Sequence, residues 1–133
     1  MTDSACTVEN SILWGNTNNA QATPTAQWQI YSESSSVQVN TSCVQDHTTY
    51  FLTAGAGNIG DDPHFINAAT SDLRISANSG VIDRGNNYVD FDPIAIGFQA
   101  LPQTDIAGNQ RIVDGNEDGE PVVDMGAYEF QGD

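Results

Sequence analysis

The stretches Cys6-Thr-Val-Glu-Asn-Ser-Ile-Leu-Trp14 and Ser36-Val-Gln-Val-Asn-Thr-Ser-Cys-Val44 decide the fold that this sequence predicts. Both alternate apolar with polar residues, as β-strands with one buried face do. When the two are laid over each other, Val8 falls opposite Val39, and one polar loop and one short strand separate them. This spacing is typical of successive turns of a β solenoid, in which no turn can bury its apolar face alone.

The same alignment bears on the two cysteines of the chain. It places Ile12 opposite Cys43 and Cys6 opposite Val37, so the two thiols take different positions. Two cysteines do not define a disulfide framework. The register argues against a bridge between them, but a bridge in a secreted protein and a pair of unlinked buried thiols both remain open.

Outward from these stretches, short β segments predominate. No stretch of twelve residues has the apolar spacing of a helix, and β-branched residues, Gly, Asn and Asp are abundant. We predict strands at 28–31 and 72–76, and a turn at 81–85 whose last residue, Gly85, takes a positive φ. Residues 86–103 form a long insertion, either a lid or a packed surface loop.

The segment Asp114-Gly-Asn-Glu-Asp-Gly-Glu120, followed by a short apolar strand within 122–130, is the strongest motif of the C-terminal part. Oxygen side chains recur at every second position before a glycine, as at the start of a calcium loop. An EF-hand would end on a bidentate carboxylate at position 12, where this chain has a methionine. The sequence predicts a Ca²⁺ loop of another type, or a solvated acidic turn. Its candidate ligands are Asp114, Asn116, Asp118, Glu120 and Asp124.

Composition restricts the classes of partner. The 133 residues carry 18 carboxylates and 3 basic residues, for a formal net charge of −15, and the chain has no lysine. Most of the carboxylates follow residue 60. Such a surface repels nucleic acid and anionic membranes. No apolar run approaches the length of a membrane helix, and no signal peptide is recognisable at the N-terminus.

Five motifs occur in a fixed order: Asn10-Ser-Ile-Leu-Trp-Gly-Asn16, Gly57-Asn-Ile-Gly-Asp-Asp-Pro-His-Phe-Ile66, Asp72-Leu-Arg-Ile with Ser79-Gly-Val-Ile-Asp-Arg-Gly85, Thr104-Asp-Ile-Ala-Gly-Asn-Gln-Arg-Ile112 and Val123-Asp-Met-Gly-Ala-Tyr-Glu129. Together they resemble the C-terminal region of bacterial right-handed parallel β-helix surface proteins of the "choice-of-anchor Q" type, over nearly the whole chain. Ser79 is followed by Gly80-Val81, where that family usually has a proline and a small residue.

The resemblance implies a secreted or surface-attached protein, with an anchor after this segment and further β-helix turns before it. It implies no particular activity, because the family is defined by architecture.

Enzymatic chemistry finds weak support in the sequence. A polysaccharide lyase needs a cation and a base, and Arg84 is one candidate cation, although pairing with nearby carboxylates is its simpler role. A glycoside hydrolase needs two carboxylates about 5–10 Å apart, and Asp90 and Asp92 could share one strand face. Trp28 and Tyr31 are candidates for stacking on a sugar ring.

The sequence therefore predicts one all-β domain over residues 1–133. Residues 1–85 form turns of a short right-handed parallel β-helix, and residues 86–133 form an insertion loop and a β-rich C-terminal cap. We expect an extracellular or cell-surface module, non-catalytic, structural or adhesive, calcium-stabilised and able to bind a polysaccharide or surface glycan. A polysaccharide-active enzyme of the β-helix class is the alternative.

Overall fold

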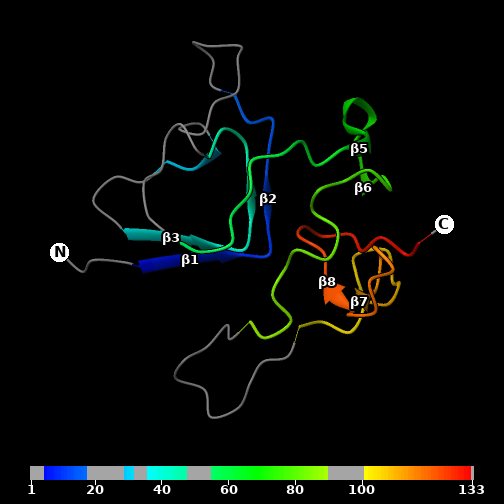
Figure 1. Ribbon diagram of the computed structural model, residues 1–133. Helices are drawn as coiled ribbons and strands as arrows, with labels where there is room; N and C mark the ends of the chain where they lie inside the picture. The colour runs from blue at the N-terminus through cyan, green and yellow to red at the C-terminus, as the bar shows by residue number, and fades with distance from the viewer. Residues whose placement is uncertain (1–4, 18–28, 32–35, 48–54, 90–100, 133) are drawn as a thin grey trace.

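The computed structural model describes residues 5–17, 29–31, 36–47, 55–89 and 101–132. Its elements are short strands and one 3-10 turn, so the broad prediction of a β-rich chain is confirmed (Figure 1). They are β1 (Ala5–Glu9), β2 (Ile12–Leu13), β3 (Ser36–Asn40), β4 (Cys43–Val44), β5 (Phe65–Asn67), η1 (Ala68–Thr70), β6 (Asp72–Ile75), β7 (Ile112–Val113) and β8 (Val122–Val123).

The predicted register of the N-terminal strands is confirmed. β1 pairs with β3 in parallel, with Val8 opposite Val39 and Cys6 opposite Val37. β2 pairs with β4 in parallel, with Ile12 opposite Cys43. Both cysteines are free; the thiol of Cys6 is exposed and that of Cys43 is buried. The alternation of apolar residues was enough to fix this register, since a slip by one residue would turn the apolar side chains to the opposite face.

A corner divides each of the two long predicted strands, 6–14 and 36–44, and the sequence did not predict it. The chain bends at Asn10 (φ 48°) and Thr41 (φ 39°), and a third segment bends in the same way at Gly57 (φ 75°). This third segment continues the stack, because Ile59 forms a parallel bridge with Cys43. Asparagine tolerates a positive φ, but a β-branched threonine rarely adopts one. The sequence around Thr41 therefore does not predict a corner there.

Side chains join the corners of the three segments. The Ser11 N–H donates to Ser42 Oγ at 3.1 Å, and the Ser42 N–H donates to Asn58 Oδ1 at 3.0 Å. Ser11 and Ser42 also repeat one local bond, since each hydroxyl donates to the carbonyl two residues earlier, at 2.8 and 2.7 Å. The residues after the second and third corners, Ser42 and Asn58, thus supply the oxygens that receive the N–H groups of their neighbours in the stack, an arrangement that we call the corner ladder.

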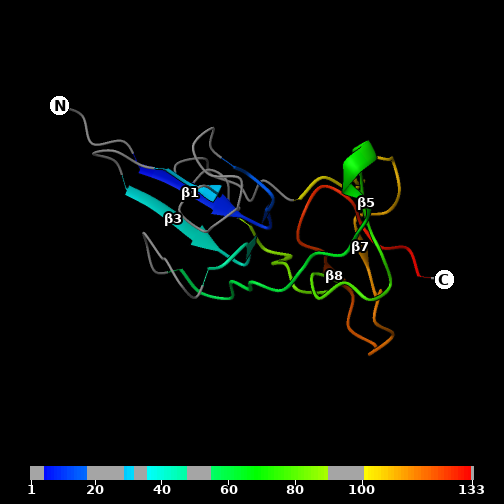
Figure 2. The ribbon, with the colours of Figure 1, turned by 90° about the horizontal axis from the view of Figure 1, so that it is seen from above.

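The second half of the chain lies beside this stack and contains two antiparallel pairs, β5–β6 and β7–β8 (Figures 1 and 2). The predicted strand at 72–76 corresponds to β6. The predicted apolar strand within 122–130 is confined to β8. Beyond it, Asp124 and Phe130 N–H donate to carboxylates, and Met125 and Gly126 N–H donate to carbonyls of other segments.

Two apolar clusters form the core, and the larger one joins the two halves. The larger contains Cys43, Val81 and Met125 among its buried members, with Ile12 and Ile59 packed against it. Thus the in-register column Ile12–Cys43–Ile59 faces the C-terminal half. The smaller cluster joins Val89 and Leu101, the two described ends of the insertion, to Val123. Residues 90–100 of the insertion lie outside the described residues.

Two local predictions were wrong. Gly85 does not have a positive φ; the left-handed residue of that turn is Asp83, at φ 54°. Glycine is required at 85 by close packing, since a Cβ there would lie 2.6 Å from the Val123 carbonyl oxygen. In the described part of the predicted strand at 28–31 there is no strand, because Gln29 is buried and its amide binds Asn16.

The two-stranded sheets are too small to establish the finer prediction, a solenoid. Each sheet of the described residues has two strands, and only the isolated bridge to Ile59 extends one of them. A parallel β-helix therefore stays a prediction, as does the division of the domain at residue 85.

Candidate functional site

The acidic loop 114–120 is closed by its own backbone. Asp114 accepts from the N–H groups of Asp118 and Gly119 at 3.0 and 2.9 Å. The Asp118 N–H also donates to Asn116 Oδ1 at 2.9 Å, and Asp118 accepts from Glu120 N–H at 2.9 Å. The structure thus brings Asp114, Asn116 and Asp118 together around one turn, with their oxygens directed toward backbone N–H groups.

Asp124, the fifth predicted ligand, lies elsewhere in the hydrogen-bond network. Only 1% of the residue is exposed. Its two oxygens accept from the N–H groups of Asp83 and Phe130, at 2.8 and 2.6 Å. One oxygen therefore anchors the turn at Asp83, and the other anchors the segment after β8 at Phe130. This geometry favours a structural role for Asp124 over ligation of a metal ion.

Asp83 connects the acidic loop to this network. Its Oδ2 accepts from Asn116 N–H at 2.7 Å, while its Oδ1 is buried without a hydrogen-bond partner in the part of the chain that the structure describes. A buried carboxylate oxygen with no donor is unusual, because leaving it unpaired costs about 1–3 kcal/mol or more. The described residues contain no group of three or more His, Cys, Asp or Glu side chains arranged to hold a metal ion.

A second network is built on Asp105, which lies in a Gly-rich turn where an Asp is expected to accept backbone N–H bonds, and on Glu129, which sequence reasoning missed. Asp105 accepts from the N–H groups of Ala107, Asn109 and Glu129, all within 3.1 Å. Glu129 accepts from Asp124 and Val113 N–H at 3.1 and 3.2 Å. The only sequence signal was the position of each acid beside a turn or a strand end.

Burial sets the ionisation of this network. Burial raises the pKa of Asp124 to about 6. Burial and, next, the charge of Asp124 raise the pKa of Glu129 to about 8. Burial also opposes ionisation of Asp105, but N–H donors led by Glu129 and Asn109 outweigh it and hold its pKa below the usual range. The buried Arg111 donates to the Gly126 carbonyl at 2.5 Å and weakly favours the charged forms of Asp124 and Glu129.

The candidate catalytic residues are not assembled into a site by the described structure. Asp90 and Asp92 lie outside the described residues. Arg84 is exposed and borders a shallow hollow with Gly115 and Asn116.

Only one of the two candidate sugar-stacking residues lies in the part of the chain that the structure describes. Trp28 lies outside the described residues, whereas Tyr31 is 76% exposed. A flat aromatic surface is available at Tyr31.

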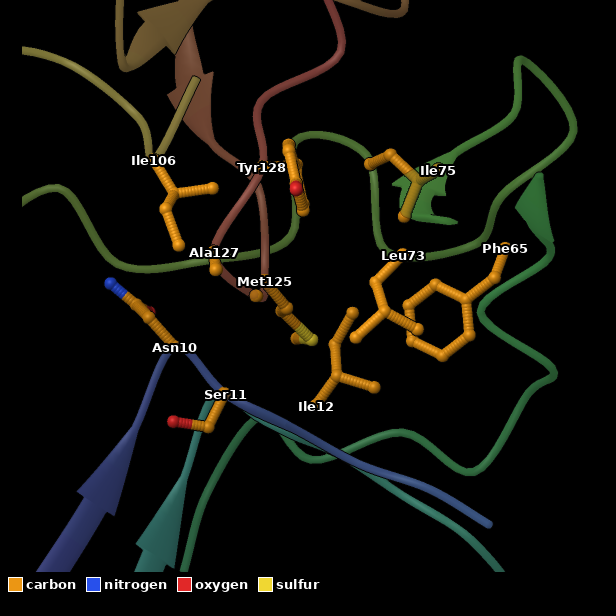
Figure 3. A pocket seen from close by; sticks show the side chains of 11 residues that line it. Asn10, Ser11, Ile12, Phe65, Leu73, Ile75, Ile106, Met125, Ala127 and Tyr128 are labelled. Carbon is orange, nitrogen blue, oxygen red and sulfur yellow. The ribbon is translucent and has the colours of Figure 1, made fainter. Parts of the chain in front are cut away.

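A hollow lies between the first corner and the C-terminal half (Figure 3). Its volume is about 460 Å³, and none of its lining residues is charged. Ile12 and Met125 point into it from opposite sides, with Leu73 and Phe65 beside them. It is lined by Asn10, Ser11, Ile12, Phe65, Leu73, Ile75, Ile106, Met125, Gly126, Ala127 and Tyr128.

Comparisons with models of known protein families, with curated proteins and with solved structures find no match to this chain. The described residues include no helix with the length and hydropathy needed to cross a membrane. Function must therefore be argued from the geometry of the chain itself.

Proposed function

We propose that this chain is a non-catalytic segment of right-handed parallel β-helix with a C-terminal cap, acting as a structural or adhesive module of a secreted or cell-surface protein. One observation carries the proposal: each of the corners at Asn10, Thr41 and Gly57 has a positive φ, and the segments that contain them pair in parallel. A structure that repeats one turn in this way is a scaffold whose length grows by addition.

A polysaccharide-active enzyme is the alternative. Assays for new reducing ends and for unsaturated uronates, run across a panel of polysaccharides, test it together with glycan-array binding. We expect binding without turnover. Turnover that is abolished by Asp90→Asn or Asp92→Asn would contradict the non-catalytic proposal.

Carbohydrate binding is proposed to use Tyr31 with Trp28. Support comes from the 76% exposure of Tyr31, because an exposed ring offers a flat apolar face to a sugar. We expect Tyr31→Ala to weaken binding to any glycan that the array identifies. Tyr88→Ala is the matched control, since Tyr88 is 82% exposed but belongs to another part of the chain. Equal losses for both variants would exclude a stacking site at Tyr31.

We further propose that Ca²⁺ binds the loop formed by Asp114, Asn116, Asp118 and Glu120 and stabilises the cap. The side-chain oxygens of this turn and the unpaired Oδ1 of neighbouring Asp83 support the proposal. Hard cations prefer such oxygen donors. Ligation would require the Asx bonds of the loop to rearrange.

Chelation tests the calcium proposal. We expect it to lower the melting temperature, because an ion at 100 times its Kd stabilises the folded state by about 2.7 kcal/mol. Asp118→Asn should reduce this effect, whereas Glu117→Gln, an exposed control in the same loop, should not. Asp124→Ala should destabilise the chain with and without Ca²⁺, since Asp124 anchors Asp83 and Phe130. An unchanged melting temperature after exhaustive chelation would exclude the ion.

A further inference from the structure

Tyr128, in the segment after β8, borders two hollows. With Ile75 of β6 it lies along one side of the hollow between the first corner and the C-terminal half (Figure 3). The same two residues line a second hollow of about 250 Å³, which we call the Tyr128 hollow. Unlike the first, the second hollow is lined by both apolar and polar side chains, so its chemistry is that of a mixed surface.

The apolar part of the Tyr128 hollow comes from β5, β6 and the C-terminal segment. Ile66, Ile75 and Phe130 contribute to it beside Tyr128. Ile66 is 52% exposed, although β5 pairs with β6. An aromatic residue beside an exposed aliphatic side chain offers an apolar surface on which the C–H face of a sugar ring can pack.

Three planar polar side chains from separate segments border this apolar surface: Arg74, Asn109 and Gln131. All three are exposed. The protein holds the nitrogens of the two amides, since Asn109 Nδ2 donates to Asp105 Oδ2 at 3.3 Å and Gln131 Nε2 donates to the Gln110 carbonyl at 3.0 Å. Within the described residues, the side-chain oxygens of both amides receive no hydrogen bond, so two oriented acceptors remain.

Donors are available in the same hollow. Arg74 Nε and Nη2 donate to the two oxygens of Asp72 at 2.8 and 2.6 Å, and Arg74 Nη1 has no acceptor in the part of the chain that is described. The Tyr128 hydroxyl likewise forms no hydrogen bond with any described residue. The hollow thus offers acceptors, a donor and a hydroxyl that can act as either. Such a mixed set matches sugar hydroxyls, each of which both donates and accepts.

Charge and size restrict the ligand further. The charge of Arg74 is matched by Asp72, and Asp105 and Glu129 also line the hollow. An anionic sugar would therefore be repelled. The volume of about 250 Å³ is smaller than the ~300–1,000 Å³ of pockets that enclose drug-sized ligands, so the hollow accommodates one ring and not a chain of them.

We propose that the Tyr128 hollow binds one ring of a neutral sugar, such as the terminal unit or a branch of a glycan. The ring packs on Tyr128, and its hydroxyls bond to Arg74, Asn109 and Gln131. This site is separate from the one proposed at Tyr31 and does not depend on it. It also requires no residue outside the described part of the chain.

The test is a titration of the isotope-labelled 133-residue chain with methyl glycosides of neutral hexoses and N-acetylhexosamines, followed by NMR. The side-chain amide signals of Asn109 and Gln131 report on this hollow alone. We expect them to shift and saturate with a Kd on the order of 1 mM, the value that the usual ligand efficiency gives a molecule of this size. Methyl glucuronide, the matched anionic probe, should shift them less at equal concentration, because its carboxylate meets Asp105 and Glu129.

Variants separate the two parts of the site. Tyr128→Leu should raise the Kd for the sugar about tenfold, because the aromatic face and the hydroxyl are both lost. Tyr128→Phe, which keeps the face, should raise it less. Gln131→Ala should raise it about fivefold through loss of one acceptor. Gln103→Ala is the matched control, since Gln103 is an exposed residue outside the lining of the hollow.

The outcomes at this hollow and at Tyr31 are distinguishable. Shifts of the Asn109 and Gln131 signals that persist in Tyr31→Ala support the site, even if Tyr31 binds nothing. Shifts confined to Gln29 and Tyr31 would overturn it and leave the proposed glycan site at Tyr31 intact. It is also overturned if no neutral sugar in excess of the expected Kd moves the Asn109 and Gln131 signals, or if Tyr128→Leu and Gln131→Ala bind as tightly as the unaltered chain.

Discussion

At the residue scale, buried carboxylates serve as acceptors for the backbone of the cap. Asp105, Asp124 and Glu129 together accept seven of the backbone N–H bonds around β7 and β8. Each is buried, yet their pKa values shift in different directions. Burial outweighs the two N–H donors at Asp124 and at Glu129, whereas three backbone N–H donors and the Asn109 amide outweigh burial at Asp105. Stability of the fold should therefore depend on pH through identifiable groups.

The raised pKa values predict a loss of stability with rising pH. Asp124 (pKa about 6) and Glu129 (pKa about 8) hold their protons more tightly in the folded chain than in the unfolded one. Their contribution is complete below the unfolded pKa values and is lost as pH rises through about 6 and about 8. Urea midpoints measured between pH 5 and pH 9 should decline, and Glu129→Gln should flatten the upper part of that decline. A midpoint that rises across this range would contradict the assignment.

A glycine substitution tests close packing at the turn before the insertion. Gly85→Ala would place a Cβ 2.6 Å from the Val123 carbonyl oxygen and 2.7 Å from Val123 Cγ1. We expect a loss of about 1–3 kcal/mol in the free energy of unfolding, measured by urea denaturation. Gly80→Ala is the control, since its Cβ would meet nothing closer than 3.6 Å. Equal stability of the two variants would show that β8 does not approach Gly85 as described.

At the scale of elements, the register of β1 on β3 could be predicted from the sequence, whereas the corners could not. Alternation of Val8, Ile12, Val39 and Cys43 carries the register, because burial of one face penalises a slip. Thr41 has a positive φ against its intrinsic preference, so tertiary contacts dictate it. The sequence allows Asp124 to be either a loop ligand or an acceptor of backbone N–H bonds, and its bonds from Asp83 and Phe130 N–H favour the second role.

The corner ladder gives a test at this scale. Ser42 is fully buried and its hydroxyl both donates to Asn40 and accepts from Ser11. Ser42→Ala should lower the free energy of unfolding by about 1–3 kcal/mol, because the partly buried Ser11 N–H loses its acceptor. Ser36→Ala, on an exposed residue of β3, should change the free energy of unfolding by less than about 0.5 kcal/mol. A Ser42→Ala chain as stable as the Ser36→Ala chain would mean that the ladder does not form.

At the scale of the whole molecule, a strong negative charge is combined with a hollow that has no charged lining residue. The formal charge of −15 disfavours polyanionic partners, and the acidic loop is the proposed place for a cation. The hollow instead offers apolar surface beside an open strand edge, a feature that natural proteins usually cover.

The central claim is that successive segments stack in parallel and in register, and a cross-link tests it most directly. Thr7 and Gln38 are exposed partners of β1 and β3. In a Cys6→Ser background, Thr7→Cys with Gln38→Cys should form a disulfide under mild oxidation, since paired Cα atoms lie within bridging range. Cys43 should not compete, because burial, chiefly, raises the pKa of its thiol to about 12. The offset pair Thr7→Cys with Asn40→Cys should remain reduced, and preferential cross-linking of this offset pair would contradict the account.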